Sequence, residues 1–181
     1  MTGIAPLGRS QTLMRERDDA VAALFQLHVA NLVRLGMCLL GDRGAAEEVV
    51  QDSFESLHRN WWRLRDHGAC LAYLRAGVVN GCRSRQRKLL RGRARMPVIG
   101  VTSSGTAPSS EETVVAAMEA ADVAAAVRLL PPRQREVLVC RYYLELSEAQ
   151  TAALLDIGRG SVKRHTFRAL AALSRRLGVQ A

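Results

Sequence analysis

The sequence predicts an all-α protein, built from two small helical bundles that a flexible linker joins. Apolar residues recur at three- and four-residue spacing through most of the chain, strand-like alternation never extends over a useful length, and one Pro-, Gly-, Ser- and Thr-rich stretch interrupts the helical pattern. The 181 residues are 48% hydrophobic but only 4% aromatic, so Leu, Val and Ala must build a modest core. This length excludes single-domain barrel enzymes of roughly 250 residues.

The first bundle is predicted over residues 18–95, after a mobile tail at residues 1–17 that contains several Gly, Pro and Ser residues. Three helices are expected there: one from Asp18 to Gly41, one from about Gly44, and one after the break at residues 66–68. The first helix has an apolar stripe of Val21, Leu24, Phe25, His28, Leu32, Leu35 and Leu39. The second has an apolar face of Ala46, Val49, Val50, Ser53, Phe54, Leu57 and Trp61. The third is expected to turn its arginines outward and to bury Leu71, Leu74, Val78 and Cys82.

A linker is predicted at residues 96–112, and the second bundle at residues 113–181. Helical periodicity there stops at Pro131 and resumes after Pro132, which suits the first turn of a helix. Ser147 and Gln150 form a capping-box pattern ahead of a short helix. The last helix runs from about Gly160 to Leu177, with an apolar face of Val162, Thr166, Ala169, Leu170, Leu173 and Leu177. Each bundle has at most about 80 residues and is expected to be only modestly stable alone.

Positive charge is concentrated in two acid-free strips. The chain has 26 Lys and Arg against 17 Asp and Glu, a net charge of +9. Residues 67–95 contain eight basic residues and residues 157–181 contain six, so the rest of the chain carries a net charge of −5. Basic strips on helices favour a polyanionic partner, because each cation near a phosphate releases condensed counterions. Nucleic acid is favoured over a membrane, since neither strip has an apolar face rich in Trp and Phe.

The last two predicted helices have the spacing of a helix-turn-helix unit, in which the second helix lies in the major groove of DNA. Burial of the apolar face would leave Arg159, Lys163, Arg164 and Phe167 pointing outward. Lys163 and Arg164 have the donors that pair with guanine, whereas Phe167 suits a thymine methyl group. Arg168 is expected at a phosphate. The alternative interpretation is an ordinary helical hairpin with a charged face.

Residues 130–173 (LPPRQREVLVCRYYLELSEAQTAALLDIGRGSVKRHTFRALAAL) resemble region 4 of bacterial sigma factors of the extracytoplasmic-function (ECF) group. Residues 39–57 (LLGDRGAAEEVVQDSFESL) resemble region 2 of the same group, and residues 73–88 (YLRAGVVNGCRSRQRK) resemble its promoter-facing helix. The two motifs occur in the expected order with a linker between them, and the resemblance covers most of the chain.

The resemblance implies that the first bundle binds the clamp helices of the RNA polymerase β′ subunit and captures the minus-ten promoter element. It implies that the second bundle reads the minus-thirty-five element beside the β flap, and that an anti-sigma factor is a possible further partner. The expected polymerase-binding residues are Glu47, Glu48, Gln51 and Asp52. The expected minus-ten residues are Trp62, Arg75, Asn80, Arg83, Ser84 and Arg87. The expected minus-thirty-five residues are Arg159, Ser161, Lys163, Arg164, Phe167 and Arg168.

The sequence predicts different roles for the neighbouring residues Trp61 and Trp62. Residues 65–70 correspond to the family's base-capturing loop, near which Trp61 is predicted in the core and Trp62 is the better candidate for stacking on a base.

The chain departs from the family at several positions. Thr151 replaces an apolar residue, and Gly158 stands where Ser usually caps the recognition helix, at a cost of a few tenths of a kcal/mol.

Other functional classes are not favoured. The four cysteines form no C-x-x-C pair, the four histidines are dispersed, and residues 156–163 lack the spacing of a phosphate-binding loop, so neither a metal, a cofactor nor catalysis is expected. No apolar run reaches the roughly 18 residues of a membrane span. The expected protein is cytoplasmic and non-enzymatic. The alternative is a helix-turn-helix regulator that binds an operator without joining a polymerase, although the first bundle has no sign of a phosphoacceptor pocket.

Overall fold

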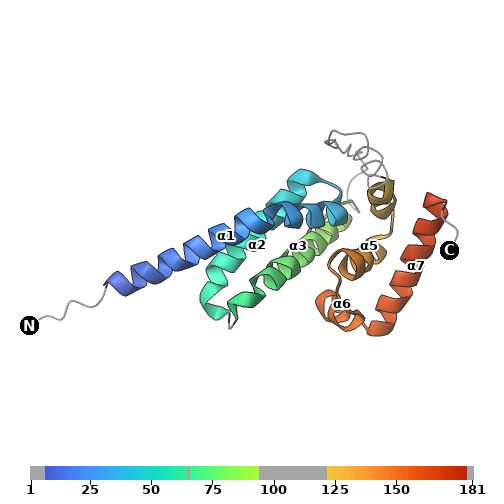
Figure 1. Ribbon diagram of the computed structural model, residues 1–181. Coiled ribbons are helices and arrows are strands. Elements are labelled where there is room, and N and C mark those ends of the chain that lie inside the picture. Colours follow the sequence, from blue (N-terminus) through green and yellow to red (C-terminus); the bar gives the residue numbers. More distant parts are fainter. Residues whose placement is uncertain (1–6, 65, 94–121, 179–181) are drawn as a thin grey trace, which may run out of the picture.

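The computed structural model describes residues 7–64, 66–93 and 122–178, and every regular element within these ranges is helical (Figure 1). The all-α prediction is confirmed. The first half consists of α1 (Leu7–Leu40), α2 (Arg43–Asn60), the single turns η1 (Trp61–Arg63) and η2 (His67–Ala69), and α3 (Cys70–Arg93). The second half consists of a helical segment at residues 122–128, α5 (Pro132–Leu138), the π turn η3 (Val139–Tyr143), α6 (Glu148–Leu155) and α7 (Arg159–Leu177). The predicted linker at residues 96–112 lies outside the described residues.

Helix α1 begins earlier than predicted, and its N-terminal half projects beyond α2 and α3 (Figure 1). The prediction of a tail is wrong for residues 7–17, which are helical. A single Gly costs a helix only about 1 kcal/mol, and the segment after Gly8 is rich in good helix formers. Asp18 also ties α1 to α2, since its Oδ1 lies 2.9 Å from Nε2 of His58. This exposed contact with α2 adds to the local helix preference.

The first bundle has most of the predicted core, but Phe25, predicted on the apolar stripe of the first helix, is 45% exposed. Leu32, Leu35 and Leu39 of α1 are buried with the apolar faces of α2 and α3. The boundary between α1 and α2 follows from two residues. Gly41 adopts a left-handed backbone with φ +74°, which ends α1. Asp42 then caps α2, with its Oδ1 accepting a hydrogen bond from the amide of Ala45 at 2.6 Å.

Helix α1 is also long and apolar enough, by length and composition alone, to cross a membrane within residues 11–40. This corrects the expectation that no stretch of the chain reaches such a length. In the structure the C-terminal half of α1 is the core helix of the first bundle, where Leu32, Leu35 and Leu39 pack between α2 and α3.

The two bundles share one core. Leu130, Leu138 and Ala169 form a small cluster of their own in the second half. Val137, Cys140 and other buried residues of the second half instead belong to the same apolar cluster as Leu39, Leu74 and Val78. The second half consequently packs on the first. Leu170, predicted to point inward on α7, is 40% exposed, because α5 and α6 cover only the side of α7 that carries Val162 and Ala169.

Small residues set the spacing between α1 and its neighbour. A Cβ atom added to Gly36 of α1 would lie 2.8 Å from the Cβ of Ala46 on α2, and Ala46 is fully buried. Carbon atoms in van der Waals contact need about 3.5 to 4 Å. The two helix backbones can approach this closely only because Gly36 has no side chain.

We expect Gly36→Ala to lower the free energy of unfolding by about 1 to 3 kcal/mol, because the added methyl forces α1 and α2 apart. Gly160→Ala is the matched control. Nothing lies within 4 Å of its added Cβ, so this variant is expected to gain about 0.5 to 1 kcal/mol from helix propensity. Urea unfolding followed by circular dichroism measures both. A Gly36→Ala variant as stable as the parent protein would contradict the close packing.

Candidate nucleic-acid interface

Helices α6 and α7 form the predicted helix-turn-helix arrangement. The capping box is confirmed: Ser147 Oγ accepts a hydrogen bond from the Gln150 amide at 3.1 Å, and Gln150 Oε1 accepts one from the Ser147 amide at 2.8 Å. Helix α6 ends at Asp156, which has a left-handed backbone with φ 52°. Gly158 precedes α7 without a side-chain cap, as its departure from the family pattern predicts. Val162 and Leu155 are fully buried where the two helices pack.

The solvent face of α7 carries the predicted recognition residues. Phe167 is 75% exposed although it is a large aromatic side chain. The residues that share this exposed face are Arg159, Lys163, Arg164, Phe167 and Arg168. Ser161 is half-buried, and its hydroxyl accepts a hydrogen bond from Arg164 at 3.2 Å. The predicted outward orientation is confirmed, and contact with bases remains a prediction.

The inner side of the same unit contains polar atoms that have no hydrogen-bond partner among the described residues. Thr151 of α6 is fully buried, and no hydrogen-bond partner for its hydroxyl lies among the described residues. His165 of α7 is half-buried, and burial, together with Arg164 and Arg168, lowers the pKa of its imidazole. The lowered pKa favours the neutral imidazole, so His165 adds little charge to the basic face.

Helix α3 divides the predicted minus-ten residues into two groups. Arg75, Asn80 and Arg87 are exposed and Ser84 is half-buried, but Arg83 is buried. The prediction that the arginines of α3 point outward is thus wrong for Arg83. Its side chain enters the interface between the two bundles, because the second half packs on that side of α3.

The buried guanidinium of Arg83 has partners in the second half. Its Nη2 donates to the carbonyl of Leu155 at 2.8 Å, and its Nη1 donates to the carbonyl of Leu154 at 3.4 Å. Its Nε lies 3.5 Å from Oε2 of Glu136, and the two side chains are only 10% and 6% exposed. Glu136 also pairs with Arg133 at 2.9 Å. Glu136 was not among the predicted functional residues, although an acid beside the apolar run 137–140 was a usable signal.

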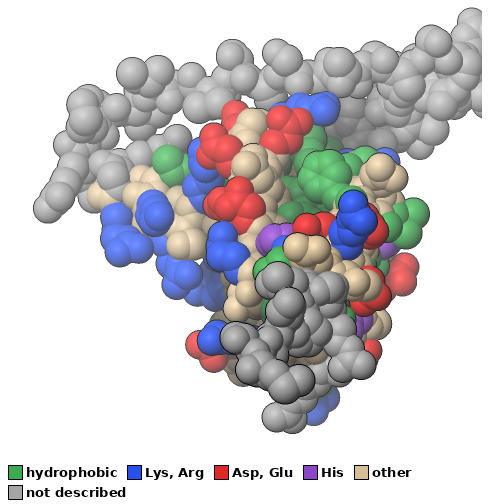
Figure 2. Space-filling view, turned by 90° about the vertical axis from the view of Figure 1, so that its left-hand side faces the viewer, with side chains coloured by type: hydrophobic (Ala, Val, Ile, Leu, Met, Phe, Trp, Pro, Cys, Tyr) green, Lys and Arg blue, Asp and Glu red, His purple; other side chains and the backbone are tan. Residues whose placement is uncertain are grey.

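The acidic face of α2 lies on the solvent side, as predicted. Glu47, Glu48, Gln51 and Asp52 are all exposed. Glu47 pairs with Arg43 at 2.8 Å, and Glu48 pairs with Arg85 of α3. Figure 2 shows acidic side chains gathered in one area of the molecular surface, next to exposed hydrophobic side chains.

An apolar groove of about 810 Å³ borders the acidic face, between α1 and α2. Its apolar lining comes from Phe25, Val29, Val33, Met37 and Val50. Glu47 and Gln51 also line it, together with the cations Arg34 and Arg43. This surface combines an apolar floor with a charged rim, which is the composition of a protein-binding site.

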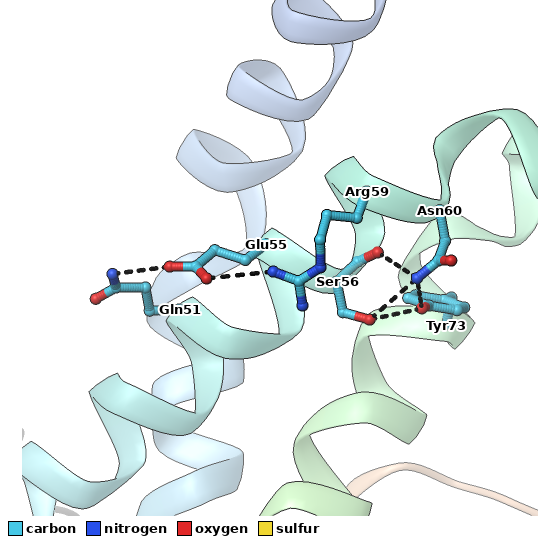
Figure 3. A network of polar contacts seen from close by, with 6 residues as sticks. All are labelled: Gln51, Glu55, Ser56, Arg59, Asn60 and Tyr73. Atoms are coloured by element: carbon cyan, nitrogen blue, oxygen red, sulfur yellow. Dashed lines mark hydrogen bonds and ion pairs between the residues drawn. The ribbon is translucent and has the colours of Figure 1, made fainter.

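A polar network fixes the end of α2 against α3 (Figure 3). Ser56 Oγ and Tyr73 Oη share a hydrogen bond of 2.9 Å, and Asn60 Nδ2 donates to the carbonyl of Ser56 at 2.8 Å. On the outer side, Gln51 Nε2 donates to Glu55 at 3.1 Å, and Glu55 pairs with Arg59 at 3.5 Å. Residues at the end of α2 are thereby held in place beside α3.

The segment that follows α2 places its two tryptophans differently, as predicted. Trp61 is buried and stacks on His67, with ring centroids 4.4 Å apart and an angle of 29° between the rings. Trp62 is 55% exposed. Asp66 orders the next turn, because its Oδ1 accepts a hydrogen bond from the Gly68 amide at 2.8 Å. Trp62 is thus an exposed aromatic ring on a segment held by its neighbours.

Neither a metal centre nor a reactive thiol is apparent in the described part of the chain. No group of three or more His, Cys, Asp or Glu side chains there is placed to hold a metal ion. All four cysteines are free, and burial raises the pKa of Cys82 and of Cys140 to about 12. These two thiols stay protonated and act as small apolar groups.

Comparison with known proteins agrees with this arrangement. Residues 120–173 match the family model described as Sigma-70, region 4. The ECF RNA polymerase sigma factor SigL of Mycobacterium tuberculosis is 33% identical over 162 residues, which cover 87% of this chain and 90% of SigL. SigM of the same organism is 31% identical over 155 residues, which cover 86% of this chain and 76% of SigM. The sigma factor RpoE from Bartonella quintana, crystallised with the anti-sigma factor NepR, has the same fold, with a TM-score of 0.68 at 20% identity over 88% of this chain and 98% of that one.

The two helical bundles and the helix-turn-helix define a sigma-70 type of transcription factor. The chain belongs to the ECF RNA polymerase sigma factors. It is thus a regulatory subunit that directs RNA polymerase to promoters. The alternative of an operator-binding regulator is not supported, because the similarity to sigma factors runs through the first bundle as well as the second.

We expect Thr151→Val to raise the free energy of unfolding by about 1 to 2 kcal/mol, because it replaces a buried hydroxyl that lacks a partner with a methyl group of similar size. Thr151→Ser keeps the hydroxyl and removes the methyl, so it should be less stable than the parent protein. Thermal unfolding of the three proteins compares them. A Thr151→Val variant that is no more stable than the parent would show that the hydroxyl is satisfied.

Proposed function

We propose that this sigma factor divides its work among three surfaces: α7 reads the minus-thirty-five element, α3 and the η1 turn capture the minus-ten element, and α2 binds core RNA polymerase. The observation that carries the proposal is the exposed face of α7, where four cations and Phe167 share one side of a helix-turn-helix. The proposal assigns the chain no catalysis of its own and places it in the cytoplasm, where its polymerase is.

The exposed face of α7 supports recognition in the major groove. Arg164 and Lys163 have donors for guanine, and Phe167 offers an apolar surface for a thymine methyl group. Arg159 and Arg168 carry charges that suit phosphates at the groove edges. Lys163 forms a long ion pair of 3.9 Å with Glu148 of α6, and its side chain is 68% exposed, so its ammonium can turn toward DNA.

The first bundle supports capture of an unstacked base. Melting a promoter costs a few kcal/mol for each flipped base, so a protein must offer a surface on which the base can stack. Trp62 is an exposed ring, and Arg75, Asn80 and Arg87 are exposed on the neighbouring helix. We infer that these side chains hold the minus-ten strand.

The acidic face of α2 and the adjoining groove support docking of polymerase. We infer that the clamp helices of the β′ subunit lie along Glu47, Glu48, Gln51 and Asp52, and that an apolar side chain of the clamp enters the groove lined by Val33 and Met37. The second bundle lies near the β flap in this arrangement. An anti-sigma factor that covered the same face would block polymerase.

Run-off transcription with purified core polymerase tests the function directly, and we expect promoter-specific transcripts only when this protein is present.

Glu47→Lys combined with Asp52→Lys is expected to abolish both the transcripts and capture of β′ in a pull-down, because the charge of the docking face is reversed. Glu16→Lys combined with Asp19→Lys changes the net charge equally on α1 and should retain both activities. Unchanged capture of β′ by the α2 variant would exclude this face as the docking site.

Arg164→Ala is expected to cost about 1 to 3 kcal/mol of binding to a matched minus-thirty-five duplex, and much less on a scrambled duplex, if Arg164 contacts a base. Arg175→Ala, in the last turn of α7, is the control and should weaken binding to both duplexes equally. Fluorescence anisotropy measures the six affinities of the parent protein and the two variants for the two duplexes. Equal losses on both duplexes for Arg164→Ala would reassign this residue to a phosphate.

A further inference from the structure

The interface between the two bundles uses Arg83, a residue that the sequence predicts at the minus-ten element. Arg83 lies on the basic strip of α3, yet its guanidinium is surrounded by the second half of the chain. It reaches the end of α6 through the carbonyls of Leu154 and Leu155, and it reaches α5 through Glu136. One side chain therefore connects α3 with two helices of the second half.

The chemistry of this contact matches what an arginine finds on DNA. The last carbonyls of a helix lack intrahelical donors and carry partial negative charge, and the carboxylate of Glu136 carries a full one. A guanidinium pairs in the same way with carboxylate and phosphate oxygens. Arg83 thus has, inside the protein, a set of oxygen acceptors that resembles a phosphate group.

Other contacts close the same interface. The carbonyl of Leu39, at the end of α1, accepts a hydrogen bond from Arg135 of α5 at 2.6 Å across the interface, and one from Gln86 of α3 at 2.7 Å within the first bundle. Tyr143 of η3 donates to the carbonyl of Asn31 at 3.2 Å. Arg75, a second expected minus-ten residue, lines a cavity of about 260 Å³ at the same interface, together with Tyr143. The second half consequently occupies the neighbourhood of two α3 arginines.

We propose that the pair Arg83–Glu136 is an interdomain latch that holds the free protein closed and keeps Arg83 from DNA. When the bundles separate, Arg83 exchanges Glu136 and the α6 carbonyls for promoter phosphates. The closed packing of the free protein stands independently of the proposed function, whereas the role of Arg83 at DNA rests on it. In a closed protein the apparent affinity of the minus-ten surface is reduced by the fraction of molecules that are open.

The two ion pairs of Glu136 provide a control, because one of them crosses the interface and the other lies within α5. Arg83 comes from the first bundle, whereas Arg133 belongs to the same helix as Glu136 and is about half exposed. Removing the Glu136 carboxylate leaves the two guanidinium groups near each other without an acid between them. Removing Arg133 leaves the interdomain pair intact.

Small-angle X-ray scattering of the full chain tests the closed state. The parent protein and Arg133→Gln are expected to have the same compact radius of gyration, and Glu136→Gln and Arg83→Gln are expected to have a larger one. Circular dichroism checks that the helices persist. Should Glu136→Gln lose helix, Arg83→Gln decides by the same criterion. An extended parent protein, or variants as compact as the parent, would overturn the latch.

Intrinsic fluorescence then tests whether the latch hides the minus-ten surface. The chain has two tryptophans, Trp61 and Trp62, both in η1, so quenching by a mixed-sequence single-stranded DNA oligonucleotide reports binding at the first bundle and not at α7. Glu136→Gln should lower the half-saturating oligonucleotide concentration at least about fivefold, through a larger open fraction. The double variant Glu136→Gln with Arg83→Gln should lose this gain, and Arg133→Gln should match the parent.

The outcomes separate the two claims. Expansion in Glu136→Gln without tighter binding of the oligonucleotide would overturn the masking of Arg83. Expansion and tighter binding together with a failure of run-off transcription would leave the latch in place and overturn the proposed function.

Discussion

The arrangement of the two bundles depends on how one charge is accommodated in an apolar interface. A guanidinium withdrawn from water is tolerated only where acceptors replace the lost hydration. For Arg83 these acceptors are Glu136 and the two carbonyls at the end of α6. Because the carbonyls belong to the last turn of α6, the end of that helix must point at α3. The turn at Asp156 then carries the chain away from the interface, so that the exposed face of α7 stays in solvent.

The contact between Arg83 and Glu136 also changes which cations of the basic strip of α3 are available to DNA. The sequence places eight cations and no acid in residues 67–95, which predicts a continuous positive charge along this strip. In the structure the strip is divided. Arg83 is paired with Glu136 inside the protein, Arg85 is paired with Glu48 of α2, and Arg87 remains exposed. Among the described residues, the cations of α7 have no comparable partners in the interface. The closed protein therefore presents α7 to DNA more fully than α3.

Much of the fold could be predicted because helical periodicity reports which face of each helix is apolar. The stripe ending in Leu39, the capping box at Ser147 and the exposed Trp62 all follow from local spacing. Periodicity does not report what covers a polar face, so the burial of Arg83 could not be predicted in this way. One feature of the sequence does indicate the shared core, namely the apolar run at residues 137–140. Residues 136–140 are all buried in the structure, and a helix that is buried all round needs a second neighbour.

The location of the proposed polymerase-docking face limits what can open the protein. A partner shifts an equilibrium between two states only through its differential affinity for them. The acidic face of α2 and the groove beside α1 are exposed while the bundles are closed, so binding there favours neither state by itself. Opening exposes Val137 and Cys140, which are buried in the shared core, and this exposure costs free energy. That cost must be met by contacts that exist only in the open protein, namely contacts with the basic strip of α3 or with the uncovered side of α5. If polymerase docks on α2 as proposed, that docking and the release of α3 are distinct steps, and the second step requires DNA or a surface of the polymerase that replaces α3 as the neighbour of α5.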